Sequence, residues 1–227
     1  KKILENEKVI PIINAKYLEK EFIKKFKLKK WNGFFLPDVF DDKKKFIKAE
    51  YEKKERYCFA GGVNNRDWET LINVLKELPK IKCVIVAGKN AINNNQLPNN
   101  IKYLEEIPAK EYYNLMEGAF LTICPLKENK VSGLINIIKS IQNGIPCITT
   151  DWDVTSIYYP KRLKQSKLLY KKNDKESLKR SIEYCWNLNK NEYIKISEEM
   201  QNYLQNNFKP QMIIETLRKE LIRRKWL

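Results

Sequence analysis

Short apolar runs alternate along this chain with longer stretches of helical periodicity, and this alternation constrains the fold more than any other feature. The predicted strands are residues 9–13, 34–36, 57–60, 83–87, 101–104, 121–124, 147–150 and 168–170. The predicted helices are residues 15–27, 68–78, 110–117, 134–143 and 175–187. Nearly continuous apolar strands joined by helices are typical of a parallel sheet covered on both faces. The sequence therefore predicts an α/β fold with a doubly wound, Rossmann-like parallel sheet.

The composition is that of a folded domain. The chain has 227 residues, of which 43% are hydrophobic and 11% aromatic, enough to bury a sizeable core. No apolar run approaches the roughly 20 residues that a membrane span needs, and no signal-peptide core follows the basic N-terminus. We therefore expect a cytoplasmic protein. Because the chain begins at Lys1 and not at methionine, we also expect it to be a fragment.

The cysteines and the absence of histidine limit the chemistry. The first four of the five cysteines lie inside apolar runs, and none are spaced as metal-ligand pairs; the five are Cys58, Cys83, Cys124, Cys147 and Cys185. We predict reduced core residues that bind no metal. Without histidine, the commonest general base and the commonest zinc ligand are both missing. Catalysis by this chain would depend on carboxylates, on electrostatics or on another domain.

The formal charge of +16 is unevenly distributed. Residues 56–159 carry 11 Lys and Arg against 10 acids, whereas residues 160–227 carry 17 against 8. No nucleic-acid-binding module is visible, so we expect no nucleic acid partner. Two interpretations of the charge stay open. In the first, the lysines lie on helix faces that are exposed to solvent. In the second, they attract an anionic membrane surface, with contacts at residues 24–30, 43–45 and 218–225.

The run SGLINIIKSIQNGIPCITT at residues 132–150 is the strongest functional signal. A Ser-Gly turn opens an apolar-striped helix, Gly144 closes it, and Pro146 leads into a strand. The first backbone N–H groups of such a helix have no intrahelical partner, and its dipole leaves about half a positive charge there. The sequence therefore predicts an anion site that suits a diphosphate.

Glycines follow the ends of the predicted strands. Gly61 and Gly62 come after one strand and Gly133 after another, so we expect two ligand loops at one edge of the sheet. For Gly88 and Gly118 a simple turn is the better interpretation. The run GGVNNRDW lacks the spaced third glycine of the dinucleotide fingerprint.

Arg66 lies between Gly62 and the next predicted helix. From there its guanidinium could reach a phosphate bound at the N-terminus of the neighbouring helix. The alternative for Arg66 is a surface ion pair. Asp67 is predicted to cap the helix that follows it.

The helix after Gly133 has a defined inner face made by Leu134, Ile137, Ile138 and Ile141. Ser132 and Lys139 are seven positions apart, which on a helix means one face and about 10.5 Å of rise. One of them could touch the phosphate or sugar of a nucleotide while the other reaches its ribose.

Several segments together resemble a known family. They are YCFAGG, RDWETL, KCVIVAG, LPNNIKYLEEIP, EYYNLMEGA, LTICPL, SGLINIIKSIQNGIPCITT and LLYKKNDKESLKRSIE. In this order, over residues 57–187, they resemble the C-terminal, nucleotide-sugar-binding lobe of retaining GT-B fold glycosyltransferases, the family 4-like or group 1 enzymes. The runs PIINAKYLEKEF and FFLPDVFDD resemble the junction between the two lobes of those enzymes.

The resemblance implies a domain division and a reaction. Residues 1–50 would end the N-terminal lobe or form the interlobe junction, residues 51–190 would bind the donor nucleotide, and residues 191–227 would be a C-terminal helical extension. The implied reaction moves a sugar from a nucleoside diphosphate sugar to an acceptor hydroxyl, with retention and without metal or cofactor. The acceptor would be a glycan or lipid-linked glycan of surface polysaccharide assembly, at the inner face of the membrane.

The resemblance also implies residue roles at the donor site, although it assigns no catalytic residue. Around the donor diphosphate it places Gly61, Gly62, Arg66, Ser132, Gly133 and Leu134. Near the ribose and base it places Lys139, Glu105, Glu106 and Ile107.

The chain departs from the family at two of these positions. Ser132 and Lys139 stand where the resembled enzymes usually have glutamates, and a lysine ammonium has three donors and no acceptor for a ribose hydroxyl. Either the donor is held differently or activity has been lost, and without the N-terminal lobe we expect the fragment to be inactive. The alternatives are a non-catalytic glycosyltransferase-like scaffold and a basic α/β domain that binds nucleic acid.

The predicted C-terminal helix, residues 209–227, carries an apolar stripe of Ile213, Ile214, Leu217 and Leu221 among basic residues. In the resembled enzymes a terminal helix supports the first lobe, so we expect this stripe to pack against protein. The alternative is an amphipathic helix on a membrane surface.

Overall fold

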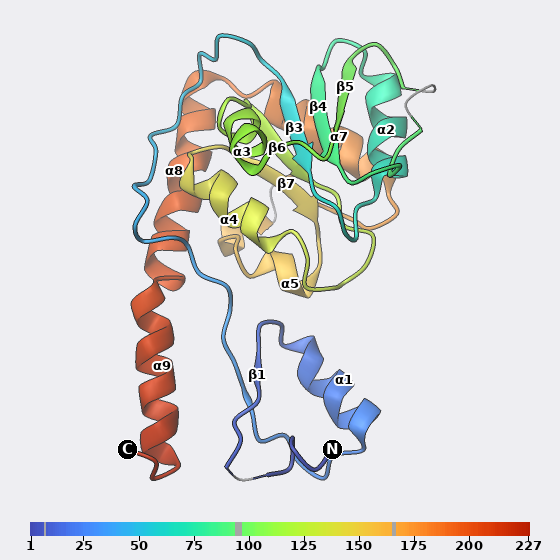
Figure 1. The fold of residues 1–227 in the computed structure, drawn as a ribbon. Coiled ribbons are helices and arrows are strands. Elements are labelled where there is room, and N and C mark those ends of the chain that lie inside the picture. Colours follow the sequence, from blue (N-terminus) through green and yellow to red (C-terminus); the bar gives the residue numbers. More distant parts are fainter. Residues whose placement is uncertain (7, 94–96, 165–166) are drawn as a thin grey trace. The chain divides into compact units, whose positions relative to one another are not determined.

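The computed structural model describes residues 1–6, 8–93, 97–164 and 167–227. These residues form a six-stranded parallel sheet with the strand order β5-β4-β3-β6-β7-β8 (Figure 1). The strands are β3 (Cys58–Gly61), β4 (Cys83–Ala87), β5 (Ile101–Glu105), β6 (Leu121–Cys124), β7 (Cys147–Thr150) and β8 (Leu169–Tyr170). The chain runs outward from β3 to β5 and then from β6 to β8 in the opposite direction. This order confirms the predicted doubly wound α/β fold.

Four helices connect or cover these strands close to where the periodicity predicted them. They are α2 (Trp68–Glu77), α3 (Ala109–Glu117), α4 (Leu134–Gln142) and α7 (Lys175–Trp186). Figure 1 shows α3 and α4 on one face of the sheet and α7 on the other, where α7 contacts α2. The Asp67 carboxylate accepts a hydrogen bond from the Thr70 N–H at 3.1 Å, which confirms Asp67 as the cap of α2.

The core lies between the sheet and its helices. Every residue of β3, β6 and β7 is buried, as expected for parallel strands covered on both faces. All five cysteines are buried and reduced, which confirms their interpretation as core residues. The stripe of Leu134, Ile137, Ile138 and Ile141 is buried as predicted.

Some elements are shorter than predicted or were not predicted. The run at residues 9–13 contributes only β1 (Ile12–Ile13), which pairs in parallel with β2 (Phe34–Phe35) in a separate two-stranded sheet. Pro11 limits this strand because it has no N–H to donate, and only its carbonyl takes part, accepting from Phe34 at 3.0 Å. The one-turn helices α5 (Asp153–Ser156) and α6 (Lys161–Lys164) were not predicted, because four residues are too few to show a helical period.

The chain divides into two compact units. Residues 44–204 contain the six-stranded sheet, and residues 1–43 with 205–227 contain β1, β2, α1 (Tyr17–Phe26) and α9 (Pro210–Arg223). The helix α8 (Lys190–Asn207) begins where a C-terminal helical extension was predicted. The domain division at residues 50 and 190 stays a prediction.

No residue of α9 is buried. Within its stripe, Ile213, Leu217 and Leu221 are half-buried, while Ile214 is 65% exposed. Arg224, just after the helix, donates a hydrogen bond to the Asn32 side chain of the same unit at 3.0 Å. Among the helices of the described residues, none combines the length and the apolar character that crossing a bilayer requires.

Candidate functional site

The candidate site lies where the chain changes direction in the sheet. The strand β3 pairs with β4 on one side and with β6 on the other, and the loops that follow β3 and β6 meet at their carboxyl ends. The two loops are joined by hydrogen bonds from the Asp67 N–H to the Pro125 carbonyl (2.9 Å) and from the Asn65 amide to the Glu128 carbonyl (2.9 Å). In open α/β sheets ligands bind at this kind of crevice. The predicted convergence of the two glycine loops is therefore confirmed.

Arg66 links the two loops. Its Nε donates to the Gly61 carbonyl (3.0 Å), and its Nη1 donates to the Asn64 carbonyl (2.7 Å) and to the Ser132 hydroxyl (3.1 Å). Among the ion pairs between described residues, none includes Arg66, so the surface ion-pair alternative is wrong for these residues. None of the described hydrogen bonds uses Nη2, and this leaves two N–H donors for an anion.

Glycine is required on both sides of the guanidinium. Gly62 has a φ of 137°, and a Cβ there would lie 2.3 Å from Arg66 Nη2. Gly133 has a φ of 75°, and its Cβ would lie 2.5 Å from the Cys124 sulfur and 3.1 Å from the same Nη2. Side chains at these two positions would displace the guanidinium from the loop junction.

The N-terminus of α4 lies beside this guanidinium. Gly133 is its N-cap and has no side chain to satisfy the first N–H groups of the helix. The Ser132 hydroxyl is engaged on both sides, because it accepts from Arg66 and donates to the Asn64 carbonyl at 3.0 Å. Among the described contacts, the donors at this helix start that have no side-chain partner are therefore the first backbone N–H groups of α4 and Arg66 Nη2.

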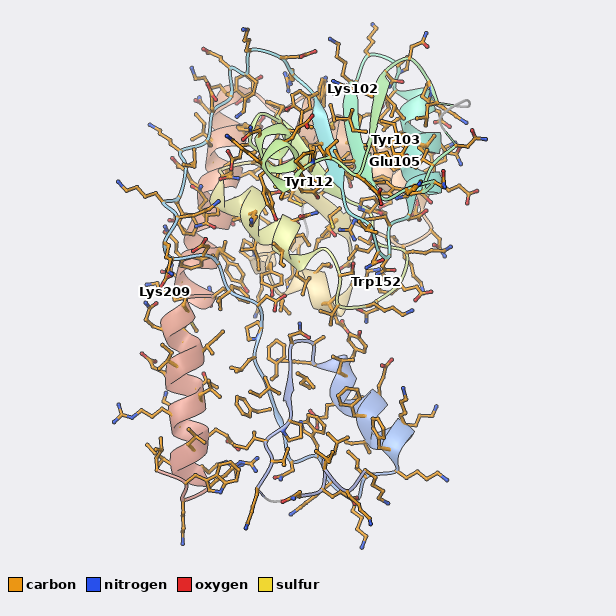
Figure 2. All side chains as sticks on the ribbon, in the orientation of Figure 1. Lys102, Tyr103, Glu105, Tyr112, Trp152 and Lys209 are labelled. Carbon is orange, nitrogen blue, oxygen red and sulfur yellow. The ribbon has the colours of Figure 1, made fainter. Side chains whose placement is uncertain are left out.

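Two residues of the site were not predicted. The Asn136 amide nitrogen, in the first turn of α4, donates to the Gly61 carbonyl (3.0 Å) and to the Tyr112 hydroxyl (2.6 Å). Tyr112 belongs to α3 (Figure 2), and its hydroxyl lies close to Gly61, because a Cβ on Gly61 would lie 2.2 Å from the Tyr112 oxygen. Burial raises the pKa of Tyr112, so its hydroxyl stays protonated. The signal that could have revealed Asn136 is that it is the one polar residue in the run LINII.

The residues predicted near the ribose and base separate into two places. Lys139 lies with its Nζ 3.5 Å from the centre of the Tyr113 ring, a cation–π contact. Ile107 packs, with Tyr112 and Tyr113, against the buried cluster around Phe59. These two predicted residues therefore share one aromatic neighbourhood.

The two predicted glutamates lie at the end of β5. Glu105 accepts hydrogen bonds from the Tyr103 hydroxyl (3.2 Å) and from the backbone N–H of Asn90, in the loop after β4. Figure 2 shows Tyr103 and Glu105 together on β5. Glu106 has a φ of 49° and turns the chain toward α3. No described contact joins either glutamate to Arg66 or Lys139.

The part of the chain that the structure describes contains no group of three or more His, Cys, Asp or Glu side chains placed to hold a metal ion. The cation at this site is a guanidinium. The arrangement can hold an anion between Arg66 and the start of α4, and a planar or sugar group beside the tyrosines.

Comparison with protein-family models gives no match, and comparison with curated proteins gives none either. Solved structures do match. A glycosyltransferase from Rickettsia africae has a TM-score of 0.70 at 15% identity, covering 92% of this chain and 62% of its own. The pneumococcal O-GlcNAc transferase solved with UDP and GlcNAc has a TM-score of 0.64 at 12% identity, covering 94% and 44%.

A third similar structure is the C-terminal domain of a group 1 family glycosyl transferase from Francisella tularensis. Its TM-score is 0.54 at 11% identity, and the match covers 72% of this chain and 89% of that domain. This chain spans less than two thirds of the length of the Rickettsia africae and pneumococcal structures. At these identities the likeness concerns the fold, a Rossmann-like α/β fold that this chain shares with these glycosyltransferases.

Proposed function

We propose that this chain carries the donor site of a glycosyltransferase and binds the diphosphate of a nucleoside diphosphate sugar between Arg66 and the start of α4. The observation that carries the proposal is the hydrogen bond between Arg66 and Ser132. It holds a guanidinium, with two unused donors, beside a helix N-terminus capped by a glycine. The shared Rossmann-like fold supports the same assignment.

In this proposal the diphosphate receives charge-assisted hydrogen bonds from Arg66 Nη2 and backbone donors from Gly133 and Leu134. Gly61 and Gly62 allow the ligand to approach the backbone closely. Lys139 contacts the ribose, and the base lies toward Ile107 and the loop that contains Glu105 and Glu106. The Tyr113 ring offers a stacking surface for the base.

The proposed reaction breaks the bond between the anomeric carbon and the diphosphate oxygen, and forms a bond from that carbon to an acceptor hydroxyl, which loses its proton. Negative charge develops on the leaving diphosphate. A fixed guanidinium and a helix N-terminus stabilise that charge without a metal ion. Retention, and an acceptor in surface polysaccharide or glycan assembly, are proposed from the resemblance. The chain alone is proposed to bind donor without turning it over.

One observation favours a second candidate, a non-catalytic glycosyltransferase-like binding protein. Lys139 and Ser132 stand where the resembled enzymes have glutamates, and both are occupied, Lys139 with Tyr113 and Ser132 with Asn64. A lobe that binds nucleotide sugar without transferring it would keep Arg66, Gly62 and Gly133. It would lose the two glutamates that the resembled enzymes have at the positions of Ser132 and Lys139.

Calorimetric titration of the chain with UDP, GDP and CDP tests the proposal. Binding of at least one diphosphate is expected. Arg66→Ala should weaken it by about 10- to 100-fold, the effect of losing hydrogen bonds from a charged group. Arg180→Ala is the matched control, because it removes the same charge from an exposed position on α7.

The proposal fails if none of the three diphosphates binds, or if Arg66→Ala and Arg180→Ala bind equally well. Sugar transfer separates the two candidates. The full-length protein should release nucleoside diphosphate from a bound sugar nucleotide only when an acceptor is present, and the non-catalytic candidate predicts binding with no release.

A further inference from the structure

A second surface lies at the opposite end of α4 from the candidate site. The segment 44–49 passes beside α4 and α8 without regular secondary structure (Figure 1). It exposes Lys44, Lys45 and Lys48 around the side chain of Ile47, which is 54% exposed. We call these four residues the lysine–isoleucine patch.

The patch is held in place by two buried glutamines. The Gln142 side chain donates to the Lys44 carbonyl (2.9 Å), and the Ile47 N–H donates to the Gln142 carbonyl (2.9 Å). The Gln201 side chain, on α8, donates to the Ile47 carbonyl (2.7 Å). Gly144 allows this close passage, because a Cβ there would lie 2.6 Å from the Ile47 carbonyl. Fixed carbonyls and amides on its inner side turn the Ile47 side chain outward.

A hollow of about 380 Å³ adjoins the patch. Its lining contains Lys44, Lys45, Ile47, Lys48, Glu50, Lys53, Glu117 and Asn143. Lys53 is largely engaged, because its ammonium donates to Glu50 (3.3 Å) and to the Glu117 carbonyl (3.2 Å). The three patch lysines are exposed, so their charge is available to a partner in solvent.

We propose that the lysine–isoleucine patch docks this protein on an anionic lipid bilayer. Each lysine near an anionic membrane surface adds to the electrostatic free energy of binding. An aliphatic side chain among the lysines contributes further free energy when it is buried at the boundary between the lipid headgroups and the acyl chains. A nucleic acid would gain from the lysines but not from an exposed isoleucine, and the one aromatic residue of the segment, Phe46, is half-buried. The proposal does not depend on the proposed function.

The position of the patch leaves the candidate site accessible. The helix α4 has nine residues, so its two ends are about 13 Å apart. Gly133, at one end, borders the candidate site, and Asn143, at the other end, borders the patch. Docking through the patch should therefore leave nucleotide binding unchanged.

Sedimentation with lipid vesicles tests the proposal on the full chain. Vesicles of phosphatidylcholine containing 30% phosphatidylserine should bind it, and vesicles of phosphatidylcholine alone should not. Replacing Lys44, Lys45 and Lys48 together by glutamine should weaken binding on the order of 100-fold. Ile47→Asn should weaken it about tenfold, with less dependence on salt than the lysine effect.

The control replaces Lys76, Lys80 and Lys102 by glutamine, which removes the same charge from exposed positions on α2, the turn after it and β5. This control should retain binding within about threefold. All substituted side chains are exposed, and unchanged circular dichroism and an unchanged midpoint of urea denaturation would report an intact fold.

Three results would overturn the proposal: no binding to anionic vesicles, equal binding to neutral and anionic vesicles, or equal loss in the control and patch variants. Binding of duplex RNA or an acidic peptide through the patch, without vesicle binding, would assign the patch to that partner instead.

Discussion

Arg66 donates a hydrogen bond from Nη1 to the hydroxyl of Ser132 at 3.1 Å, across 66 positions of the sequence. This contact joins the loop after β3 to the residue before the cap of α4. It also orients the guanidinium, whose remaining donors lie beside the glycine that starts the helix. The proposed donor site depends on this pair.

Ser132→Ala tests the pair directly. The variant removes the acceptor for Nη1, and the affinity for the best nucleoside diphosphate should fall about fivefold, the effect of one hydrogen bond. Combining it with Arg66→Ala should add little beyond Arg66→Ala alone, because both changes remove the same interaction. A double-mutant cycle by calorimetry measures the coupling, and strictly additive losses would show that Ser132 does not position Arg66.

Lys139→Ala separates contacts to the nucleoside from contacts to the diphosphate. If Lys139 reaches the ribose, the variant should bind the nucleoside diphosphate about five- to tenfold more weakly and bind inorganic pyrophosphate as the parent does. Arg66→Ala should weaken both ligands. Competition titrations with pyrophosphate measure the difference, and parallel losses for both ligands in Lys139→Ala would place Lys139 at the phosphates.

Gly133→Ala should destabilise the protein. The residue has a φ of 75°, and the added methyl would lie 2.5 Å from the Cys124 sulfur, so we expect a loss of about 2 kcal/mol in the free energy of unfolding. Gly88→Ala is the control, because its nearest atom is Val63 Cγ1 at 3.0 Å, on an exposed side chain that can move. Urea denaturation measures both variants. If the double variant Gly133→Ala with Cys124→Ala regains part of the lost stability, the clash is with the Cys124 sulfur. Equal stability of Gly133→Ala and Gly88→Ala would contradict the prediction.

Arg56 should be replaceable by an apolar side chain of similar length. Its guanidinium lies 3.6 Å from the centre of the Phe120 ring and 4.8 Å from that of Trp186, and its Nε is buried without a hydrogen-bond partner among the described residues. Arg56→Met removes this desolvated donor and keeps the packing, but it also removes the hydrogen bond from Nη2 to the Trp186 carbonyl, so it should cost about 1.5 kcal/mol. Arg56→Ala should cost about 3 kcal/mol, because it leaves a cavity among aromatic rings. Equal costs in urea denaturation would contradict this account.

The cysteines predict how the native protein responds to alkaline pH. Burial raises the pKa of Cys147 to about 12 and also raises the pKa of Cys58, Cys83, Cys124 and Cys185. Their thiols should not react with a disulfide reagent at pH 9, whereas all five should react in urea. Because the folded pKa lies above the unfolded value of 9.0, the stabilisation is complete below pH 9 and is lost toward pH 12. Rapid labelling of native protein at pH 9 would contradict the burial.

Local patterns were sufficient for much of the fold. The apolar run at residues 121–124 predicted β6, and the spacing of Leu134, Ile137 and Ile141 predicted the buried face of α4. Asp67 was recognisable as a cap because capping depends on neighbours three positions away. The short helices α5 and α6 were missed because a single turn has no period to detect.

The candidate site was only partly predictable. Glycines and a helix start indicated where an anion would bind, since those properties belong to the backbone. Asn136 was not identified as a site residue, because its partners, Gly61 and Tyr112, are distant in the sequence. Glu105 was grouped with Lys139, but the structure pairs it with Tyr103 and Asn90.

By itself, the sequence determined the six strands of the main sheet and the four helices α2, α3, α4 and α7, which side chains of α4 face the core, and where a helix N-terminus follows a strand. These properties depend on periodicity and on turn residues a few positions apart. Only the tertiary structure decided that β3 lies beside β6, and this adjacency brings Arg66 to Ser132 and Asn136 to Gly61. Such contacts depend on the packing order of the strands, which the local pattern of residues does not encode.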